Sequence, residues 1–303
     1  MSKKKILITG GTGFIGYHLA SECLKRKFLV TSISVNKPNK LRKLNKVKYL
    51  YCDISNKKKL YKILDKNYDF VVNLAGYVDH TMKKKTKESH YIGCKNLALF
   101  FLNTKISKFV QIGSSVEYGK LKSPHIENNK NSQKTHSVYG FSKLLSTKFL
   151  LGLNQKLDFP VSILRLYLAY GPYQEINRVI PITINKAIKK KNFACSGGLQ
   201  LRDFLYIDDV IKSIFKVLYN KNANGEIFNI GSGKPLRVKY VINKICRVIG
   251  SGKPEFGKIK LRKDEPKSLY PNINKAKKLL KWRPIVGIDI GLKKTITYYK
   301  NIK

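Results

Sequence analysis

The stretch Thr9-Gly10-Gly11-Thr12-Gly13-Phe14-Ile15-Gly16 determines how the rest of the chain is interpreted. It joins the short apolar run 6–9 to the amphipathic run 17–27, so it lies where a first strand gives way to a first helix. Glycines at this spacing permit a tight turn, close approach of the backbone to a pyrophosphate, and close packing of helix on sheet. The free amides of the helix N-terminus also favour phosphate charge. We therefore predict a dinucleotide-binding turn made by Gly10, Gly13, Phe14, Ile15 and Gly16.

Short apolar runs and longer amphipathic runs alternate beyond this turn. The apolar runs predict strands at residues 6–9, 28–35, 47–51, 70–74, 109–112 and 161–168. The amphipathic runs predict helices at residues 17–27, 56–65, 86–104 and 137–153. Strands separated by helices of this length pair in parallel, because each connection has to cross over one face of the sheet. The sequence therefore predicts an α/β fold with a Rossmann-type doubly wound parallel sheet.

The pattern changes after Gly171-Pro172, where the connections lengthen and glycine turns recur. We interpret this half as a smaller mixed domain packed on the carboxyl edge of the sheet. The predicted division is an NAD(P)-binding Rossmann domain with the catalytic residues over 1–170 and a C-terminal substrate domain over 171–303. Parts of 203–235 are expected to return to the first domain.

The end of the second predicted strand indicates which dinucleotide is bound. NAD enzymes place an Asp or Glu there to bind the ribose 2′-hydroxyl. This chain has Asn36 and Lys37 instead, with Arg42 close behind, so a 2′-phosphate would meet positive charge. The sequence favours NADP, and NAD is the alternative if these cations belong only to the general lysine excess. Asp53 and Ile54 follow the third strand and are predicted to meet the adenine; the alternative is that Asp53 caps a helix.

Tyr139 and Lys143 are four residues apart and lie on one face of a predicted helix. A phenol has a pKa near 10, and a neighbouring ammonium favours its ionised form. Upstream, Ser114 and Ser115 follow a predicted strand, at the edge of the sheet where ligands bind. One of these serines is predicted to hydrogen-bond the substrate oxygen that Tyr139 protonates or deprotonates. The tyrosine–lysine spacing is common by chance, but glycine turn, serine and Tyr/Lys helix in this order form a specific combination.

These motifs resemble the extended short-chain dehydrogenase/reductases, the group of sugar-nucleotide epimerases, dehydratases and reductases, over nearly the whole chain. Further matching segments are residues 73–76, 113–119, 164–172, 177–181, 202–210 and 274–284. The resemblance implies a nucleotide-diphosphate sugar as substrate and assigns catalysis to Ser114, Tyr139 and Lys143. It also implies that Ser115 assists at the substrate and that the cofactor is contacted by Leu74, Ala75 and Gly76, besides Tyr139 and Lys143. Because family members are often dimers through a four-helix face, which here would use the helices at 86–104 and 137–153, we expect a homodimer.

The charge balance alone would suggest a nucleic-acid partner. The chain has 61 Lys+Arg against 18 Asp+Glu, a formal net charge of +43. Only nine of these cations are arginine, which nucleic-acid readers favour, and the lysines are spread along the whole chain. We therefore interpret the excess as a trait of composition, and RNA binding on the same fold is kept as a distant alternative.

Three of the few arginines lie in the half expected to hold the substrate. Arg178, Arg202 and Arg262 stand at positions resembling the family's phosphate- and ribose-binding residues, and a guanidinium fork suits a pyrophosphate. We predict that they bind substrate. The alternative for Arg202 is a structural ion pair with Asp208 or Asp209.

The sequence also indicates where the protein acts. The N-terminal apolar run is shorter than the ~7–15 residues of a signal peptide. No window approaches the ~18 apolar residues of a membrane span. The five cysteines form no C-x-x-C pair, so we expect neither a disulfide framework nor a metal site. The expected location is the cytoplasm, without membrane attachment.

Departures from the family pattern narrow the expected reaction. The 4,6-dehydratases place an acid one or two positions after the catalytic serine or threonine, but here 115–116 carry none and Glu117 comes one residue later. Many epimerases carry an asparagine where this chain has Leu168, and the helix asparagine that supports the active site is replaced by His90 or Tyr91. The leading hypothesis is an NADP-dependent reductase of a 4-keto-sugar nucleotide. The alternative is a sugar-nucleotide 4-epimerase with retained NAD.

Overall fold

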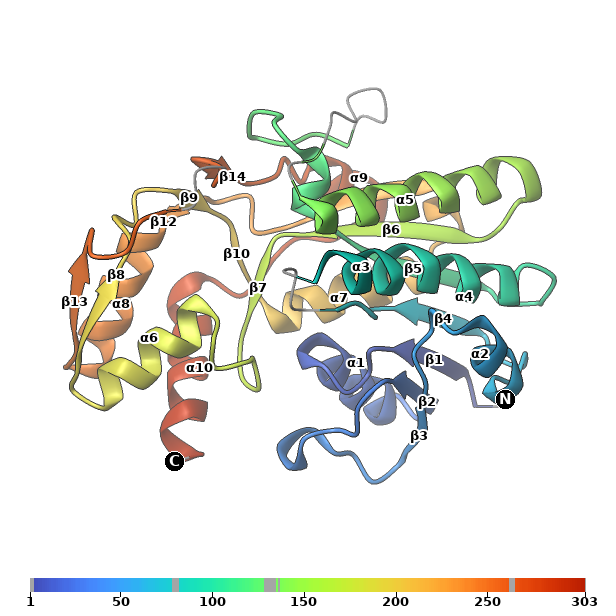
Figure 1. The fold of residues 1–303 in the computed structure, drawn as a ribbon, viewed down its shortest axis with the longest axis horizontal. Helices are drawn as coiled ribbons and strands as arrows, with labels where there is room; N and C mark the ends of the chain where they lie inside the picture. The colour runs from blue at the N-terminus through green and yellow to red at the C-terminus, as the bar shows by residue number, and fades with distance from the viewer. Residues whose placement is uncertain (1–2, 78–81, 128–134, 136, 262–264, 303) are drawn as a thin grey trace.

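The larger half of the molecule is built on a seven-stranded sheet in the order β11-β6-β5-β4-β1-β2-β3. The computed structural model describes residues 3–77, 82–127, 135, 137–261 and 265–302. The strands are β1 (Lys5–Thr9), β2 (Leu29–Ser34), β3 (Val47–Tyr51), β4 (Phe70–Asn73), β5 (Lys108–Ser114), β6 (Val161–Leu166) and β11 (Glu226–Ile230). Each pairing within the sheet is parallel. The predicted Rossmann-type doubly wound sheet is confirmed, and Figure 1 shows it in the half that carries the N-terminus.

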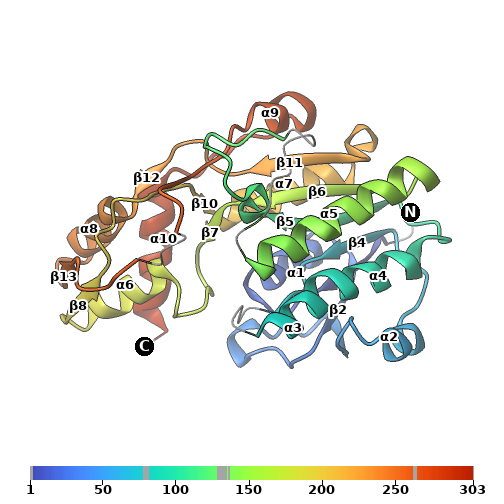
Figure 2. The ribbon, with the colours of Figure 1, turned by 45° about the horizontal axis from the view of Figure 1, so that its top comes forward.

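Helices cover both faces of this sheet. Those on one face are α2 (Lys57–Ile63), α4 (Gly93–Phe101) and α5 (Val138–Leu157); those on the other are α1 (Phe14–Lys25) and α7 (Ile207–Leu218). In Figure 2, α4 and α5 cross the near face of the sheet while α1 and α7 lie behind it. Side chains alternate between the two faces along each strand, so Ile6 and Ile8 pack in one core cluster and Leu7 in the other. Covering both faces explains why consecutive residues in the central strands are apolar, as in residues 6–8 of β1 and 70–72 of β4.

The helix predicted over 86–104 is interrupted by one π-helical turn. It begins as α3 (Lys83–Lys87), passes through η2 (Glu88–Ile92) and continues as α4. The long strand predicted over 161–168 is also divided: β6 ends at Leu166, and a separate strand β7 (Leu168–Tyr170) leaves the main sheet.

The smaller half contains helices and short strand pairs, to the left in Figure 1. Its helices are α6 (Val179–Ile188), α8 (Val238–Ile249) and α10 (Ile288–Asn301), whereas α9 (Asn274–Leu280) returns to pack beside β11 of the large sheet. Its strand groups are β7 with β10 (Phe204–Tyr206), β8 (Asn192–Cys195) with β13 (Lys253–Phe256), and β9 (Leu201–Arg202) between β12 (Leu236–Arg237) and β14 (Ser268–Leu269). The division at residue 170 stays a prediction. Within 203–235, β11 is a strand of the large sheet and α7 packs against that sheet.

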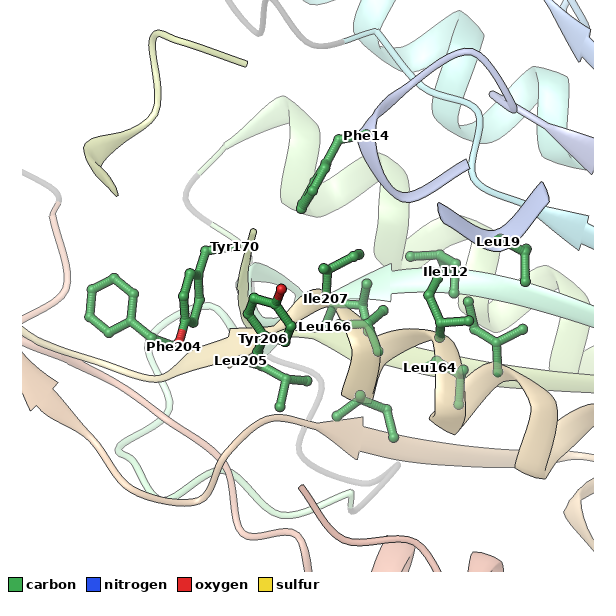
Figure 3. Close-up of a cluster of buried hydrophobic side chains, with 14 of the residues drawn as sticks. Phe14, Leu19, Ile112, Leu164, Leu166, Tyr170, Phe204, Leu205, Tyr206 and Ile207 are labelled. Carbon is green, nitrogen blue, oxygen red and sulfur yellow. The ribbon is translucent and has the colours of Figure 1, made fainter. Parts of the chain in front are cut away.

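Buried apolar side chains join the two halves. Figure 3 shows Leu164 and Leu166 of β6 and Ile207 of α7 in a cluster that continues to Tyr170 and Phe204. All five are less than a tenth exposed, so this shared core fixes how the halves are placed. Of the described residues, none lies in a helix long and apolar enough to span a bilayer.

The closing segment of the chain is anchored to the start of α7. The Trp282 indole Nε1 donates to the Asp209 carbonyl (3.1 Å), and the Asp209 carboxylate accepts the amides of Ile285 (2.9 Å) and Val286 (2.8 Å). The final sequence segment that resembled the family therefore has a structural role.

Candidate active site

The glycine turn leaves an anion-binding helix N-terminus open. Gly10 adopts φ +71°, a conformation that favours glycine. A β-carbon on Gly16 would lie 2.3 Å from the Gly10 carbonyl oxygen, so only glycine fits there. Gly13 caps α1 without a side-chain hydrogen bond, and no acidic residue stands in the first turn. The first amides of α1 are thus available to a pyrophosphate, and the residues present fit a dinucleotide.

The residues after β4 lie against this turn. The Leu74 amide donates to the Thr9 carbonyl (3.1 Å), and the Ala75 amide to the Thr9 hydroxyl (3.3 Å). A β-carbon on Gly76 would overlap the His90 imidazole at 1.8 Å. Leu74, Ala75 and Gly76 therefore sit beside the predicted cofactor turn, where their backbone allows close approach.

The alternative interpretation of Asp53 as a helix cap is wrong. Asn56 caps α2, because its side chain accepts the Lys59 amide at 3.0 Å. Asp53 is exposed and its side chain accepts the nearby Ser55 amide (2.9 Å), while Ile54 is buried. The exposed Asp53 carboxylate remains open to an adenosine.

The loop after β2 carries its cations in two different environments. Asn36 and Lys37 are exposed. Arg42 reaches back to the glycine turn: its Nη1 lies 3.5 Å from the Thr12 carbonyl oxygen and 2.9 Å from Glu175 Oε1. Glu175 follows β7 in the other half of the molecule, so no local sequence signal identified it. This ion pair ties the cofactor loop to the segment that leads to α6.

Ser114, Tyr139 and Lys143 meet at the carboxyl edge of the sheet. Ser114 ends β5, and α5 begins after Ser137, whose hydroxyl accepts the Gly140 amide (3.1 Å). Ser114 hydrogen-bonds Tyr139, and Lys143 Nζ donates to the Ile112 carbonyl at 2.7 Å. The structure thus brings together the three residues that the sequence singled out for catalysis.

The electrostatics of this cluster differ from the expectation in one respect. Burial raises the pKa of Tyr139; the hydrogen bond with Ser114 and the charge of Arg178 lower it, and Glu117 raises it. Burial lowers the pKa of Lys143, while the Glu117 carboxylate raises it. Ser114 and Arg178 therefore favour the phenolate in place of Lys143, whose ammonium is turned to a backbone carbonyl.

His90 is one of the two residues, with Tyr91, expected in place of the family's supporting asparagine. Its ring packs edge-on against the Tyr139 ring at 4.8 Å between centroids, and its Nε2 lies 3.2 Å from the Tyr77 carbonyl oxygen. The π-helical turn of η2 carries this side chain, so the contact of His90 helps to place the phenol.

The two serines differ in exposure. Ser114 is half-buried, and its hydroxyl accepts the Val116 amide at 3.5 Å. Ser115 begins the short η3 helix (Ser115–Tyr118) and is only 5% exposed. Ser114 has the more open hydroxyl, and the substrate contact expected of Ser115 stays a prediction.

Glu117 is turned into the interior. Its carboxylate accepts the Ser114 amide (2.7 Å), the Thr147 hydroxyl (2.7 Å) and Arg165 Nε (3.0 Å). Because these three donors occupy the Glu117 carboxylate, Glu117 is not free to act as the acid that the dehydratases place after the catalytic serine or threonine. Neither Thr147 nor Arg165 was singled out by the sequence.

The structure places the arginines expected to bind substrate in different environments. Arg178 is exposed at the start of α6, and its charge acts on Tyr139, which places it at the site. Arg202 is buried and paired with Glu265, and its Nη1 donates to the Leu201 carbonyl at 2.8 Å. Arg262 lies outside the described residues.

The ion-pair alternative for Arg202 named the wrong carboxylates. Asp209 accepts backbone amides near the C-terminus, and Asp208 lies 3.8 Å from Lys294. Arg202 pairs with Glu265 instead, 63 residues away in the sequence. Any role of Arg202 at a substrate has to compete with this partner.

Over the part of the chain that the structure describes, no group of three or more His, Cys, Asp or Glu residues is arranged to hold a metal ion.

Comparison with known proteins relates the chain to enzymes that act on sugar nucleotides. A family model described as "NAD dependent epimerase/dehydratase family" matches residues 6–231. The chain is 30% identical to dTDP-4-dehydro-6-deoxyglucose reductase of Escherichia coli, over 97% of each chain. It is 29% identical to UDP-N-acetyl-alpha-D-glucosaminuronate decarboxylase of Bacillus cytotoxicus, over 99% of each. UDP-glucuronic acid 4-epimerase of Bacillus cereus, solved with UDP-glucuronic acid and NAD, superimposes with a TM-score of 0.87 at 27% identity, covering 99% of this chain and all of that one.

A Rossmann-type sheet with an open glycine turn and a serine, tyrosine and lysine at its carboxyl edge defines a dinucleotide-dependent enzyme. The chain belongs to the NAD dependent epimerase/dehydratase family. It is an enzyme of the sugar-nucleotide epimerase, dehydratase and reductase class that its relatives represent.

Proposed function

We propose that this enzyme is an NADP-dependent reductase of a 4-keto-sugar nucleotide. Ser114 holds the keto oxygen through its hydroxyl, and Tyr139 donates the proton that this oxygen takes up. Lys143 binds the ribose hydroxyls of the cofactor, and the amides after the glycine turn bind its pyrophosphate. When bound, NADPH supplies the hydride that reduces the keto carbon. One hydride and one proton convert the ketone to the alcohol.

The observation that carries this proposal is the position of Glu117. A dehydratase needs an acid free to remove and return protons on the sugar. Glu117 is fully buried and its carboxylate is occupied by three donors, and Ser115 and Val116 carry no acid. The residues left at the site serve hydride transfer with one proton donor, which a reductase and a 4-epimerase share, and Leu168 in place of the asparagine of many epimerases favours the reductase.

The cofactor preference rests on the loop after β2. No Asp or Glu occurs between residues 32 and 51, so nothing there binds a 2′-hydroxyl through a carboxylate or repels a 2′-phosphate. Lys37 is exposed to solvent, and Arg42 lies beside the glycine turn. This distribution of charge supports NADP over NAD.

The substrate class rests on charge and on the relatives. Arg178 stands exposed at the edge of the site, where a guanidinium fork can bind a pyrophosphate. The relatives named above act on UDP- or dTDP-sugars. A nucleotide-diphosphate sugar matches both observations.

The test mixes the purified enzyme with NADPH and a dTDP-4-keto-6-deoxy-sugar and follows the absorbance of NADPH. Stoichiometric loss of NADPH with formation of the alcohol is expected. Epimerisation of a UDP-sugar without added cofactor, together with no loss of NADPH, would show a 4-epimerase with retained NAD instead. Mass measurement of nucleotide that co-purifies with the protein separates NADP from NAD directly.

The homodimer expected through the helices at 86–104 and 137–153 remains part of this proposal. Phe141 is an exposed apolar residue on α5, with 48% of its surface accessible. Sedimentation of the native enzyme and of a Phe141→Lys variant tests whether this helix face holds two copies together.

A further inference from the structure

A buried carboxylate, that of Glu117, lies next to the end of strand β5, which carries Ser114. The Glu117 side chain is 0% exposed and that of Arg165 is 6% exposed. The Glu117 carboxylate oxygens accept from the Ser114 amide (2.7 Å), the Thr147 hydroxyl (2.7 Å) and Arg165 Nε (3.0 Å). A carboxylate is retained in the interior only when hydrogen bonds and an opposite charge compensate its lost hydration. Glu117 is therefore a buried carboxylate with compensating partners, and no step of the proposed reaction uses it directly.

The partners of Glu117 come from the elements that carry the reacting groups. Ser114 ends β5, and Glu117 closes a capping box with it: the Ser114 amide donates to Glu117 while the Ser114 hydroxyl accepts from the following turn. Thr147 lies on α5, four residues after Lys143 and eight after Tyr139, on the same helix face. One carboxylate thus ties the strand end with the serine to the helix face with the tyrosine and lysine.

Arg165 holds Glu117 from the neighbouring strand. It lies in β6, and its guanidinium also stacks over the Tyr118 ring at 4.5 Å. Tyr118 donates to Asn229 of β11 at 2.7 Å, so the cation is fixed from both sides. A fixed cation limits where the carboxylate can move.

The charge of Glu117 also reaches the reacting groups. After burial, which raises the pKa of Tyr139 and lowers that of Lys143, this carboxylate raises the pKa of both. The other charged or titratable groups that the described elements direct at the pair are Arg178, His90 and Cys94. Glu117 is the carboxylate that acts on both.

We propose that Glu117 is a positioning residue, held by Arg165 and Thr147, that sets the Ser114 hydroxyl in register with Tyr139 and Lys143. The role is distinct from catalysis, because its oxygens face the interior and do not reach substrate. It rests on the proposed function, since it takes Ser114 and Tyr139 as the groups that act on the keto oxygen.

The first test removes one hydrogen bond to Glu117 without removing a charge. Thr147→Val deletes the hydroxyl donor and keeps the ion pair, so the fold is retained. We expect kcat with NADPH and the keto-sugar nucleotide to fall about 10-fold at nearly unchanged KM, because a small misplacement of a reacting group costs rate more than binding. The matched control is Thr295→Val on α10, whose hydroxyl donates to the Gly291 carbonyl at 2.7 Å, and it should retain native kcat.

The second test removes the charge. In Glu117→Gln the alkaline limb of the kcat–pH profile should move to lower pH, because the carboxylate that raises the pKa of Tyr139 and Lys143 is gone. A purely structural defect lowers kcat and leaves the limb in place. If Glu117→Gln does not fold because Arg165 is left unpaired, Glu117→Gln with Arg165→Met removes both charges and carries the same test. Native kcat in Thr147→Val, or an unmoved limb once Glu117 is neutral, overturns the proposal.

A third measurement needs no substrate. The ultraviolet absorbance of ionised tyrosine is titrated in the native enzyme and in Tyr139→Phe, and the difference reports Tyr139. The same difference taken with Glu117→Gln should show ionisation at lower pH. If this shift is seen while the enzyme consumes no NADPH, the proposed function fails and the placement of Glu117 stands. If NADPH is consumed normally and the shift is absent, only the positioning role fails.

Discussion

Lys108 and Lys143 are buried at opposite ends of strand β5. Lys108 begins the strand and is 1% exposed; Lys143 reaches the far end of it from α5 and is 5% exposed. Each ammonium donates to a backbone carbonyl, Lys108 to Asn220 at 2.9 Å and Lys143 to Ile112 at 2.7 Å. Burial by itself therefore does not distinguish them.

The residues around Lys108 and Lys143 distinguish the two lysines. The remaining acceptors of Lys108 are the neutral oxygens of Ser162 and Asn224, and its burial lowers its pKa to about 8. Burial also lowers the pKa of Lys143, but the Glu117 carboxylate opposes this and helps to keep the ammonium charged beside Tyr139. A buried lysine held by neutral oxygens at the amino edge pins a loop. One with titratable neighbours at the carboxyl edge stands where parallel sheets bind ligands.

Replacing each lysine by methionine tests this distinction most strongly. Lys143→Met should lower turnover by ~10²–10⁴, the span usual for a group in an acid–base site. Lys108→Met should leave kcat within about twofold, since no reacting group lies at its end of the strand. NADPH consumption by both variants, with a check of folding by circular dichroism, decides the matter. Equal losses of kcat in folded variants would mean that the two ends of β5 are not functionally distinct.

The carboxyl edge can be resolved further at its two serines. Ser114→Ala should lower kcat by ~10–10²-fold, because it removes a hydrogen bond to the reacting oxygen. Ser115→Ala should have a smaller effect, since that side chain is 5% exposed and begins η3. Steady-state kinetics on both variants measure the ratio. A larger loss from Ser115→Ala than from Ser114→Ala would reverse the assignment.

Apart from Ser114, which the family resemblance joined to Tyr139, the parts of this edge that were predicted from the sequence are local. The glycine turn occupies residues 9–16, and Tyr139 and Lys143 are one helical turn apart. Such patterns carry their geometry within a few residues, because a turn or a helix face is fixed by spacing alone. The alternation of strands and helices predicted the parallel sheet for the same reason.

The parts that could not be predicted are contacts between distant residues. Arg42 and Glu175 are 133 residues apart, Arg202 and Glu265 are 63 apart, and Glu117 and Arg165 are 48 apart. Each pair forms only after the sheet brings its strands and loops together. A chain with 61 cations offers many partners to each of its 18 acids, so composition does not select among them. The interpretation of Arg202 failed to name its partner for this reason.

A cofactor variant extends the comparison to the loop after β2. Asn36→Asp with Lys37→Ala should shift the ratio of kcat/KM for NADPH over NADH by about 10-fold toward NADH, because it adds a 2′-hydroxyl acceptor and removes a cation. Glu175→Gln is the companion variant: it releases Arg42 and should shift the ratio the other way. Both ratios come from initial rates with the two cofactors. An unchanged ratio in the first variant would mean that Lys37 is only a surface charge.

The smallest expected effect lies at the amino edge and concerns stability. The folded-state pKa of Lys108 is about 8, below its ordinary value of 10.5, so the folded protein releases this proton before the unfolded chain does. The unfolded state then binds more protons between these pH values, and the free energy of unfolding rises with pH across that window. The melting temperature of the native enzyme, relative to Lys108→Met, should therefore increase by roughly 3–6 °C between about pH 7 and about pH 9.5, the shift that about 2 kcal/mol produces in a chain of this size. Lys105→Met, at an exposed lysine of the preceding loop, should leave the difference flat. If the native enzyme and Lys108→Met respond identically to pH, Lys108 keeps its proton throughout, and the two ends of β5 differ less in electrostatics than their neighbours suggest.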